Sequence, residues 1–305
     1  MLSENQPYYS LNSYLKYTFG QKVYKLALNG GMTCPNRDGT CGTRGCIFCG
    51  EDGSGAFAED SKLSISAQLE NAKKRVAKKA GNAKYIAYFQ SFTNTYADVA
   101  YLRRIFFEAI ESDTIVALSV ATRPDCLPND VLDLISELQK IKPVFVELGL
   151  QTIHKKTSDY IRSGFELQCF DTAVKNLKSI GVNVVVHVIL GLPGETKEMM
   201  LQTVDYVGKS GADGIKLQLL HVLRGTDLAV DFENGLFETL TFQEYSDILL
   251  SCLEVLPPQM VIHRLTGDGA KSLLVSPLWS ADKRRVLNDI ARLIKDKNII
   301  QGSKF

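Results

Sequence analysis

Segments that resemble buried strands alternate with segments that resemble amphipathic helices along most of this chain. The strand-like segments are short and rich in β-branched or aromatic residues, a pattern typical of strands covered on both faces of a parallel sheet. They lie at residues 22–28, 84–90, 114–122, 143–151, 183–193 and 214–222, with a weaker seventh at 259–265. Helix-like segments lie at residues 65–79, 99–110, 129–141, 170–180, 197–210 and 242–256. This α/β alternation predicts a parallel sheet with right-handed crossovers.

The strand pattern alone is compatible with a curled barrel or with an open, doubly wound sheet. Polar residues follow the strand segments, and in a barrel of parallel strands these ends share one rim, where active sites are assembled. Beyond a cysteine-rich loop, they are Gln90, Ser91, Arg123, Asp125, Gln151, residues 191–195, His221, His263 and Arg264. We find no linker or low-complexity tract, so the sequence favours one principal domain.

The composition is that of an ordinary soluble globular protein, with 45% hydrophobic and 23% charged residues among 305. The first twenty residues lack a signal-like apolar run, and no stretch of about 18 apolar residues occurs. We therefore expect a cytoplasmic protein with no membrane contact. The net charge is only +1, so a nucleic-acid partner would need a local basic patch.

Four of the seven cysteines, Cys34, Cys41, Cys46 and Cys49, fall within one glycine-rich loop. In a reducing compartment such clustering indicates metal binding rather than disulfides. Three cysteines on a 4Fe-4S cluster would leave one iron open for a ligand. The alternative is a four-cysteine zinc site that uses Cys41 as its fourth ligand. The loop's place after the first strand of a possible barrel favours the cluster.

Five motifs, in order, resemble those of the radical S-adenosylmethionine (SAM) superfamily. They are CPNRDGTCGTRGCIFCG, AYFQSFTNTY, ATRPD, ELGLQT and HVILGLPGET. More narrowly, the chain is similar to the bacterial YhcC/YtqA-type branch, which is related to the catalytic subunit of Elongator. The resemblance extends from Gly20 to the HRLTGD segment that begins at His263.

The resemblance implies a partial (β/α)6 TIM-like barrel at residues 20–222, with an N-terminal extension at 1–19 and a C-terminal extension at 223–305. Cys34, Cys46 and Cys49 would ligate the 4Fe-4S cluster, and SAM would chelate the open iron. Cys41 would not be a ligand. The loop is longer than the compact C-x3-C-x2-C spacing that is commonest in the superfamily.

The other motifs correspond by similarity to the SAM site. Gln90, Ser91 and Thr93, with Asn94 nearby, would hold the methionine amino group. Glu147 and Gln151 would address the ribose or methionyl part, and the run 188–195, with Gly191 and Glu195, would line the adenine. Arg123, His221 and Arg264 would be catalytic groups at the rim.

Each motif also has a plainer interpretation. Residues 191–194 could form only a strand-to-helix turn, and Arg123 only a salt bridge. His187, inside a strand, is more typical of a core histidine than of a ligand. Cys126, Cys169 and Cys252 have the character of ordinary thiols.

The resemblance further implies a tRNA substrate, namely the wobble uridine that carries a carboxymethylaminomethyl group. We expect a 5′-deoxyadenosyl radical to abstract hydrogen from the glycine-like methylene. Oxidation to an imine and hydrolysis would then leave aminomethyluridine, with flavodoxin or ferredoxin as the electron donor. Basic residues would hold the anticodon loop unless they form only a solvated helix face. They are Lys73, Lys74, Arg75, Lys78, Lys79 and Lys84, with Lys271, Lys283, Arg284 and Arg285 near the C-terminus.

Three other functions remain open. Because residue 305 leaves no room for Elongator's acetyltransferase domain, a radical enzyme that acts on a small molecule is the main alternative. A zinc-stapled α/β RNA-binding protein and a non-catalytic iron-sulfur scaffold are the others.

Overall fold

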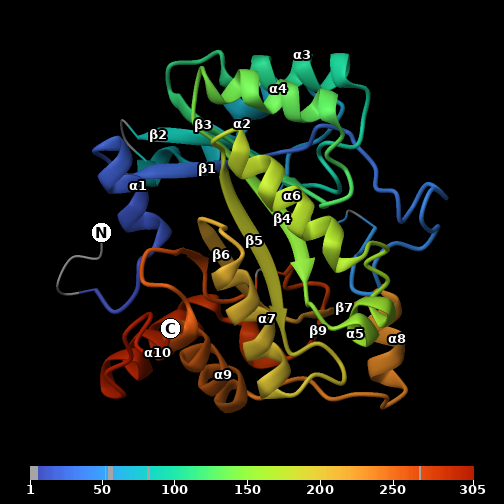
Figure 1. Cartoon of the computed structure of the whole chain (residues 1–305), viewed down its shortest axis with the longest axis vertical. Helices are drawn as coiled ribbons and strands as arrows, with labels where there is room; N and C mark the ends of the chain where they lie inside the picture. The colour runs from blue at the N-terminus through green and yellow to red at the C-terminus, as the bar shows by residue number, and fades with distance from the viewer. Residues whose placement is uncertain (1–5, 52, 54–57, 81–82, 268) are drawn as a thin grey trace.

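The computed structural model describes residues 6–51, 53, 58–80, 83–267 and 269–305, and side chains are not described at 78–80. A seven-stranded, all-parallel sheet in the order β1-β2-β3-β4-β5-β6-β8 forms its centre (Figure 1). The strands are β1 (Val23–Leu28), β2 (Lys84–Phe89), β3 (Ile115–Thr122), β4 (Val144–Gln151), β5 (Asn183–Leu190), β6 (Gly214–Leu219) and β8 (Val261–Arg264). Each lies within a segment that the sequence predicts as a strand, including the weaker seventh.

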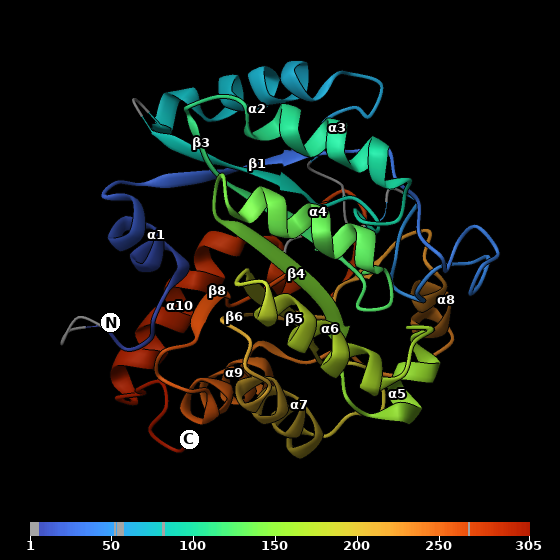
Figure 2. The ribbon, with the colours of Figure 1, turned by 45° about the horizontal axis from the view of Figure 1, so that its top comes forward.

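The sheet curls into a half-barrel, which confirms the predicted α/β fold of the radical SAM type. Helices cover its outer, convex face (Figures 1 and 2), where the largest apolar core lies. Those that follow the strands in turn are α2 (Ile65–Ala80), α3 (Val99–Ile110), α4 (Asn129–Gln139), α6 (Leu167–Ser179), α7 (Lys197–Lys209) and α9 (Phe242–Val255). Helix α10 (Lys283–Asp296) packs against α9.

The N-terminal segment lies at the amino ends of the strands. Helix α1 (Leu11–Phe19) contacts both edge strands, β1 and β8. Leu15, only 4% exposed, packs against inward-facing residues of the sheet, including Val23 and Phe145. Just before α1, the Tyr9 carbonyl accepts a hydrogen bond from the Ile262 backbone N–H of β8 at 2.7 Å. The segment therefore closes one end of the half-barrel and covers an edge that would otherwise expose backbone groups.

Smaller elements gather at the opposite end, beyond the carboxyl ends of the strands. They are α5 (Lys155–Tyr160), α8 (Asp227–Glu233) and the antiparallel pair of β7 (Val222–Leu223) and β9 (Leu274–Ser276), which is followed by the 3-10 helix η1 (Leu278–Ala281). A separate apolar cluster joins Ile47 of the cysteine loop to Ile161, Leu192 and Leu228. This cluster fixes the loops around the mouth of the half-barrel.

The sequence pattern missed α1, α5, α8, α10 and the β7–β9 pair. These elements are short or lie outside the strand–helix repeat, and tertiary contacts stabilise them more than propensity does. Within the described ranges, no helix has the length and apolarity required to cross a membrane.

Candidate active site at the mouth of the half-barrel

The cysteine loop connects β1 to α2 at the carboxyl end of the sheet. Tight turns shape it: the Cys34 carbonyl accepts from the Arg37 N–H at 2.8 Å, and the Cys46 carbonyl accepts from the Cys49 N–H at 3.0 Å. Gly45 has a φ of +74°, a conformation that side chains other than glycine rarely adopt. The loop therefore turns back on itself and brings Cys34, Cys46 and Cys49 near one another.

Cys34, Cys46 and Cys49 lie close enough to influence one another electrostatically. The pKa of Cys46 is raised to about 11, mainly by burial and in part by the neighbouring Cys49 and Cys34. Burial also raises the pKa of Cys49, although Arg37 opposes this rise. A ligand that needs thiolates would therefore have to displace protons from these buried thiols.

Polar neighbours point at this thiol group. The Asn36 Nδ2 lies 3.5 Å from the Cys46 Sγ and donates to the Arg162 carbonyl at 2.6 Å. The Arg37 guanidinium donates to the carbonyls of Cys49 and Gly50 at 3.0 and 2.5 Å. Asn36 was not among the predicted site residues, and its position two residues after Cys34 is the one sequence signal for it.

The loop is clamped from the far side of the mouth. Asp227, the first residue of α8, accepts from Arg44 at 2.7 Å and from Arg162 at 2.5 Å. The Ile47 N–H donates to the Ile161 carbonyl at 3.2 Å, and the Ile47 carbonyl accepts from the Leu228 N–H at 2.9 Å. Segments after β1, β4 and β7 are thereby tied together.

The segment after β2 is buried between the cysteine loop and β3. The Thr93 N–H donates to the Thr33 carbonyl at 3.2 Å, and the Asn94 Nδ2 donates to the Ala121 carbonyl at 2.9 Å. Gln90 begins this segment at the end of β2. Within the described residues, the Ser91 Oγ and Asn94 Oδ1 are buried without a hydrogen-bond partner. Such buried atoms are costly unless a ligand or water satisfies them.

A third atom of this kind lies at the end of β4. The Gln151 Oε1 is also buried without a partner in the described part of the chain, and Gln151 itself has a φ of +70°. Backbone strain at a non-glycine residue often accompanies a functional position. Side chains that the sequence assigns to SAM binding thus supply three unsatisfied atoms, two after β2 and one at the end of β4, at the same edge of the sheet.

The segment after β5 makes a close turn beside Gln151. Gly191 has a φ of +91°, and a Cβ there would lie 2.9 Å from Leu240. Glu195 follows this turn and accepts from the Thr152 Oγ1 at 2.5 Å. Burial raises the pKa of Glu195. The residues assigned to the adenine therefore lie next to those assigned to the methionyl part.

Arg123 lies under the cysteine loop at the end of β3. It forms a bidentate ion pair with Asp125 at 2.9 and 2.7 Å and donates to the Ser163 carbonyl at 2.7 Å. His221 follows β6 and is covered by glycines, since a Cβ at Gly267 would lie 2.6 Å from its ring. Both residues are thus at the mouth, as the sequence predicts.

Glu147 and Arg264 lie deeper, on the inner face of the sheet in the middle of the half-barrel. The Glu147 carboxylate is fully buried and accepts from Lys25 at 2.5 Å, Ser119 at 2.7 Å and Lys216. His187 also contacts it at 2.8 Å. Arg264 is paired in register with Lys216. These residues form a polar layer below the mouth rather than part of the rim, and the sequence reasoning missed Lys25 and Lys216.

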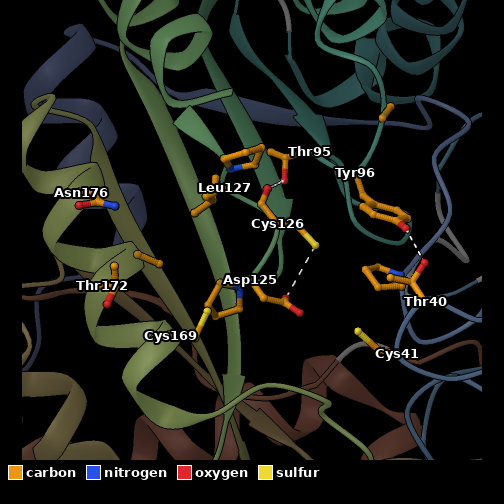
Figure 3. Close-up of a pocket in the computed structure, with 15 residues that line it drawn as sticks. Thr40, Cys41, Thr95, Tyr96, Asp125, Cys126, Leu127, Cys169, Thr172 and Asn176 are labelled. Atoms are coloured by element: carbon orange, nitrogen blue, oxygen red, sulfur yellow. Dashed lines mark hydrogen bonds between the residues drawn. The ribbon is translucent and has the colours of Figure 1, made fainter. Parts of the chain in front are cut away.

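Cys41 is exposed and lines a separate pocket of about 720 Å³ (Figure 3). Cys126 and Cys169 line the same pocket, as do Tyr96 and Asp125. Among the described residues, no three His, Cys, Asp or Glu side chains converge on a site for one metal ion. A tetrahedral zinc site would need its sulfurs within about 4 Å of one another.

The expected basic patch on α2 does not lie beside the mouth. Helix α2 starts near the mouth and runs back to the start of β2, so its basic second half faces the opposite end. Lys73 pairs with Glu70 at 2.9 Å, and Arg75 pairs with Glu59. The side chains of Lys78 and Lys79 lie outside the described part of the structure. A helix that connects two parallel strands must run antiparallel to them. For this reason the prediction that the basic residues of α2 lie beside the mouth is wrong.

Comparisons with known proteins agree with the fold. The family model of the radical SAM superfamily matches residues 38–207, and the Radical_SAM C-terminal domain matches residues 212–296. The protein YtqA of Bacillus subtilis is 42% identical over 298 residues, which cover 98% of this chain and 92% of YtqA. YhcC of Escherichia coli is 37% identical over 93% of this chain and 91% of its own length.

More distant relatives extend this comparison. The tRNA uridine(34) acetyltransferase of Methanocaldococcus jannaschii is 26% identical over 164 residues, which are 52% of this chain and 30% of that protein. The solved structure of Elp3 from Methanocaldococcus infernus superposes with a TM-score of 0.70 at 17% identity and covers 92% of this chain and 64% of that one. This chain belongs to the radical SAM superfamily, in the YhcC/YtqA branch that is related to Elongator.

Proposed function

We propose that this radical SAM enzyme modifies the wobble uridine of tRNA, removing the carboxymethyl part of a carboxymethylaminomethyl group to leave aminomethyluridine. In this proposal Cys34, Cys46 and Cys49 hold a 4Fe-4S cluster. The observation that carries the cofactor assignment is the set of three cysteines that influence one another, with unsatisfied polar atoms at the ends of β2 and β4. Cys41 faces a different pocket and is not a ligand.

The donor set fits a cluster with one open iron. Three thiols supply three ligands, and the Asn36 amide beside Cys46 can stabilise thiolate charge through a hydrogen bond. Bound together, the cluster and SAM supply a carbon-centred radical that abstracts hydrogen.

Side chains at the strand ends would bind and orient SAM. The Ser91 Oγ and Asn94 Oδ1, with Gln151 opposite, have hydrogen-bonding capacity that no described residue uses. Gln90 and Thr93 belong to the same segment, and the Gly191 turn allows close approach of a flat ring, with Glu195 behind it. The Glu147 carboxylate already forms ion pairs with Lys25 and Lys216. Direct binding of SAM would break these pairs, so we do not assign Glu147 as a SAM ligand.

The tRNA assignment rests on relatives and on the mouth. A distant relative is named for action on tRNA uridine 34. Arg44 and Arg224 are exposed beside the mouth and could hold phosphates, while an extruded base enters it, as is common in RNA loop recognition. Arg123 and His221 would line the entry, and a flavodoxin or ferredoxin would supply the electron.

Nucleoside mass spectrometry of tRNA from a strain that lacks the gene tests this function. We expect carboxymethylaminomethyluridine to accumulate and aminomethyluridine and its derivatives to fall. Complementation with the wild-type gene should restore the pattern, and a Cys46→Ala gene should not. An unchanged nucleoside profile in the deletion strain would refute the tRNA assignment and favour a small-molecule substrate.

A further inference from the structure

The inner face of the half-barrel is divided into layers along the strands. The register of the strands places alternate residues on this face. The lowest layer is apolar and includes Val23, Ile86 and Phe145, closed by Leu15 of α1. The next layer is polar and consists of Lys25, Tyr88, Ser119, Glu147, His187, Lys216 and Arg264.

This polar layer contains more cations than anions. Glu147 is its carboxylate, and the structure pairs it with Lys25 and Lys216. Arg264 has no carboxylate partner among the described residues, and its Nη1 is 3.4 Å from the Gln218 Oε1. His187 adds no positive charge near neutral pH, since burial lowers its pKa to about 4. Three cations therefore face one anion, an arrangement that is costly in a poorly hydrated interior unless another anion joins it.

The excess positive charge affects the pKa of Lys216. Burial, together with the charges of Lys25 and Arg264, lowers the pKa of Lys216 to about 7, although Glu147 opposes this change. The ammonium also lies 4.8 Å from the Tyr88 ring centre, and its Nζ donates to the Tyr88 hydroxyl at 3.0 Å. An added anion beside Lys216 would restore the usual preference of the lysine for its charged form.

The layer is reachable from inside the half-barrel. The His187 side chain is 15% exposed and that of Lys25 20%, whereas the next residues along each strand, Val188 and Leu26, are 1% exposed. On β3 and β4, the inner-face residues that follow Ser119 and Glu147 are small, namely Ala121 and Gly149. Glu147, His187 and Lys216 lie three or four residues before the ends of their strands, about 10–13 Å. Arg264 is the last residue of the shorter β8.

We propose that this cationic layer binds the carboxylate of the substrate, with Arg264 as its principal partner and Lys216 and Lys25 as supporting charges. The inference rests on the proposed function, which supplies a substrate with one free carboxylate on a short flexible arm. A guanidinium suits a carboxylate because it can donate two parallel hydrogen bonds. The layer would then select acids over their neutral analogues and hold the methylene next to the carboxylate inside the half-barrel.

Two anticodon stem-loop RNAs test this assignment. One carries the carboxymethylaminomethyl group, and the other carries its carboxamide, which has the same shape without the charge. We expect the cluster-loaded wild-type enzyme to bind the acid on the order of 10- to 100-fold more tightly than the amide, the range for hydrogen bonds between charged groups. Arg264→Gln should abolish most of this preference.

Matched variants control for folding and for general charge. Lys25→Gln removes a second cation of the layer and should also reduce the preference, even if Arg264→Gln fails to fold. Lys22→Gln removes an exposed cation just outside the same strand and should leave the preference intact. Iron content and thermal unfolding report whether each variant is folded.

The outcomes separate this inference from the proposed function. Turnover of the acid RNA with no preference over the amide, or with a preference that both layer variants retain, would overturn the carboxylate site and leave the function standing. Preferential binding of the acid that Arg264→Gln removes, but without turnover, would support the site and refute the reaction. Binding of neither RNA would overturn the site.

Discussion

At the scale of single residues, the environment of each cysteine differs more than the spacing indicates. Cys34, Cys46 and Cys49 are half-buried and influence one another, whereas Cys41 is exposed beside the outer pocket. The four cysteines of the loop thus comprise a set of three that are near one another and a fourth, Cys41, that is separate from them. A cluster with an open iron needs three protein ligands, and a fourth would close it.

Single cysteine variants should reveal this division. We expect anaerobic protein to hold about four iron atoms per chain, and Cys34→Ala, Cys46→Ala or Cys49→Ala to lose nearly all of them together with SAM cleavage. Cys41→Ala should retain both. Iron and sulfide analysis with visible absorbance provides the measurement. Loss of metal from Cys41→Ala, or zinc in the native protein, would show that the ligand assignment is wrong.

At the scale of elements, each end of the half-barrel has its own closure. Helix α1 covers the amino ends of the strands, and α5, α8 and the β7–β9 pair surround the carboxyl ends (Figure 1). The first closure is apolar, so it contributes stability through burial. The second carries arginines, carboxylates and the cysteine loop, so it positions chemical groups. Strand direction explains this difference, because the loops after parallel strands all emerge at one end.

The closure by α1 can be measured. Leu15 is 4% exposed against the inner face of the sheet, whereas Tyr17 on the same helix is 83% exposed. Leu15→Ala should lower the free energy of unfolding by about 2–5 kcal/mol, because it removes a buried side chain and leaves a cavity. Tyr17→Ala should change it by less than about 0.5 kcal/mol. Urea unfolding of both variants provides the comparison, and equal effects would mean that α1 does not close the half-barrel.

At the scale of the whole molecule, the distribution of charge decides where RNA can bind. The net charge is +1, so only a local surface can attract phosphates. Around the mouth, Arg44, Lys156 and Arg224 are exposed on three different loops or helices. The cations of α2 lie towards the other end of the half-barrel.

This distribution predicts a contrast between two surfaces. A triple variant with Arg44, Lys156 and Arg224 changed to Ala should bind tRNA more weakly. The slope of its log affinity against log salt should be flatter by about 2, since each contact with a single-stranded phosphate contributes about 0.7. Changing Lys73 and Lys74 to Ala should leave the slope unaltered. Filter binding at several salt concentrations measures both, and the reverse result would place the RNA on α2.

The sequence by itself determined the strands, their parallel order and the main helices, because local periodicity and turn signals encode these. It also determined which loop carries the cysteines and which family the chain resembles. Only the tertiary structure decided that Cys41 stands apart, that the α2 cations face away from the mouth, and that Lys25, Lys216 and Arg264 surround Glu147. The layer around Glu147 joins residues from strands far apart in the chain, and no local pattern encodes a distance that depends on how the sheet curls. The place of Cys41 depends on how the loop folds against the segments after β2 and β3.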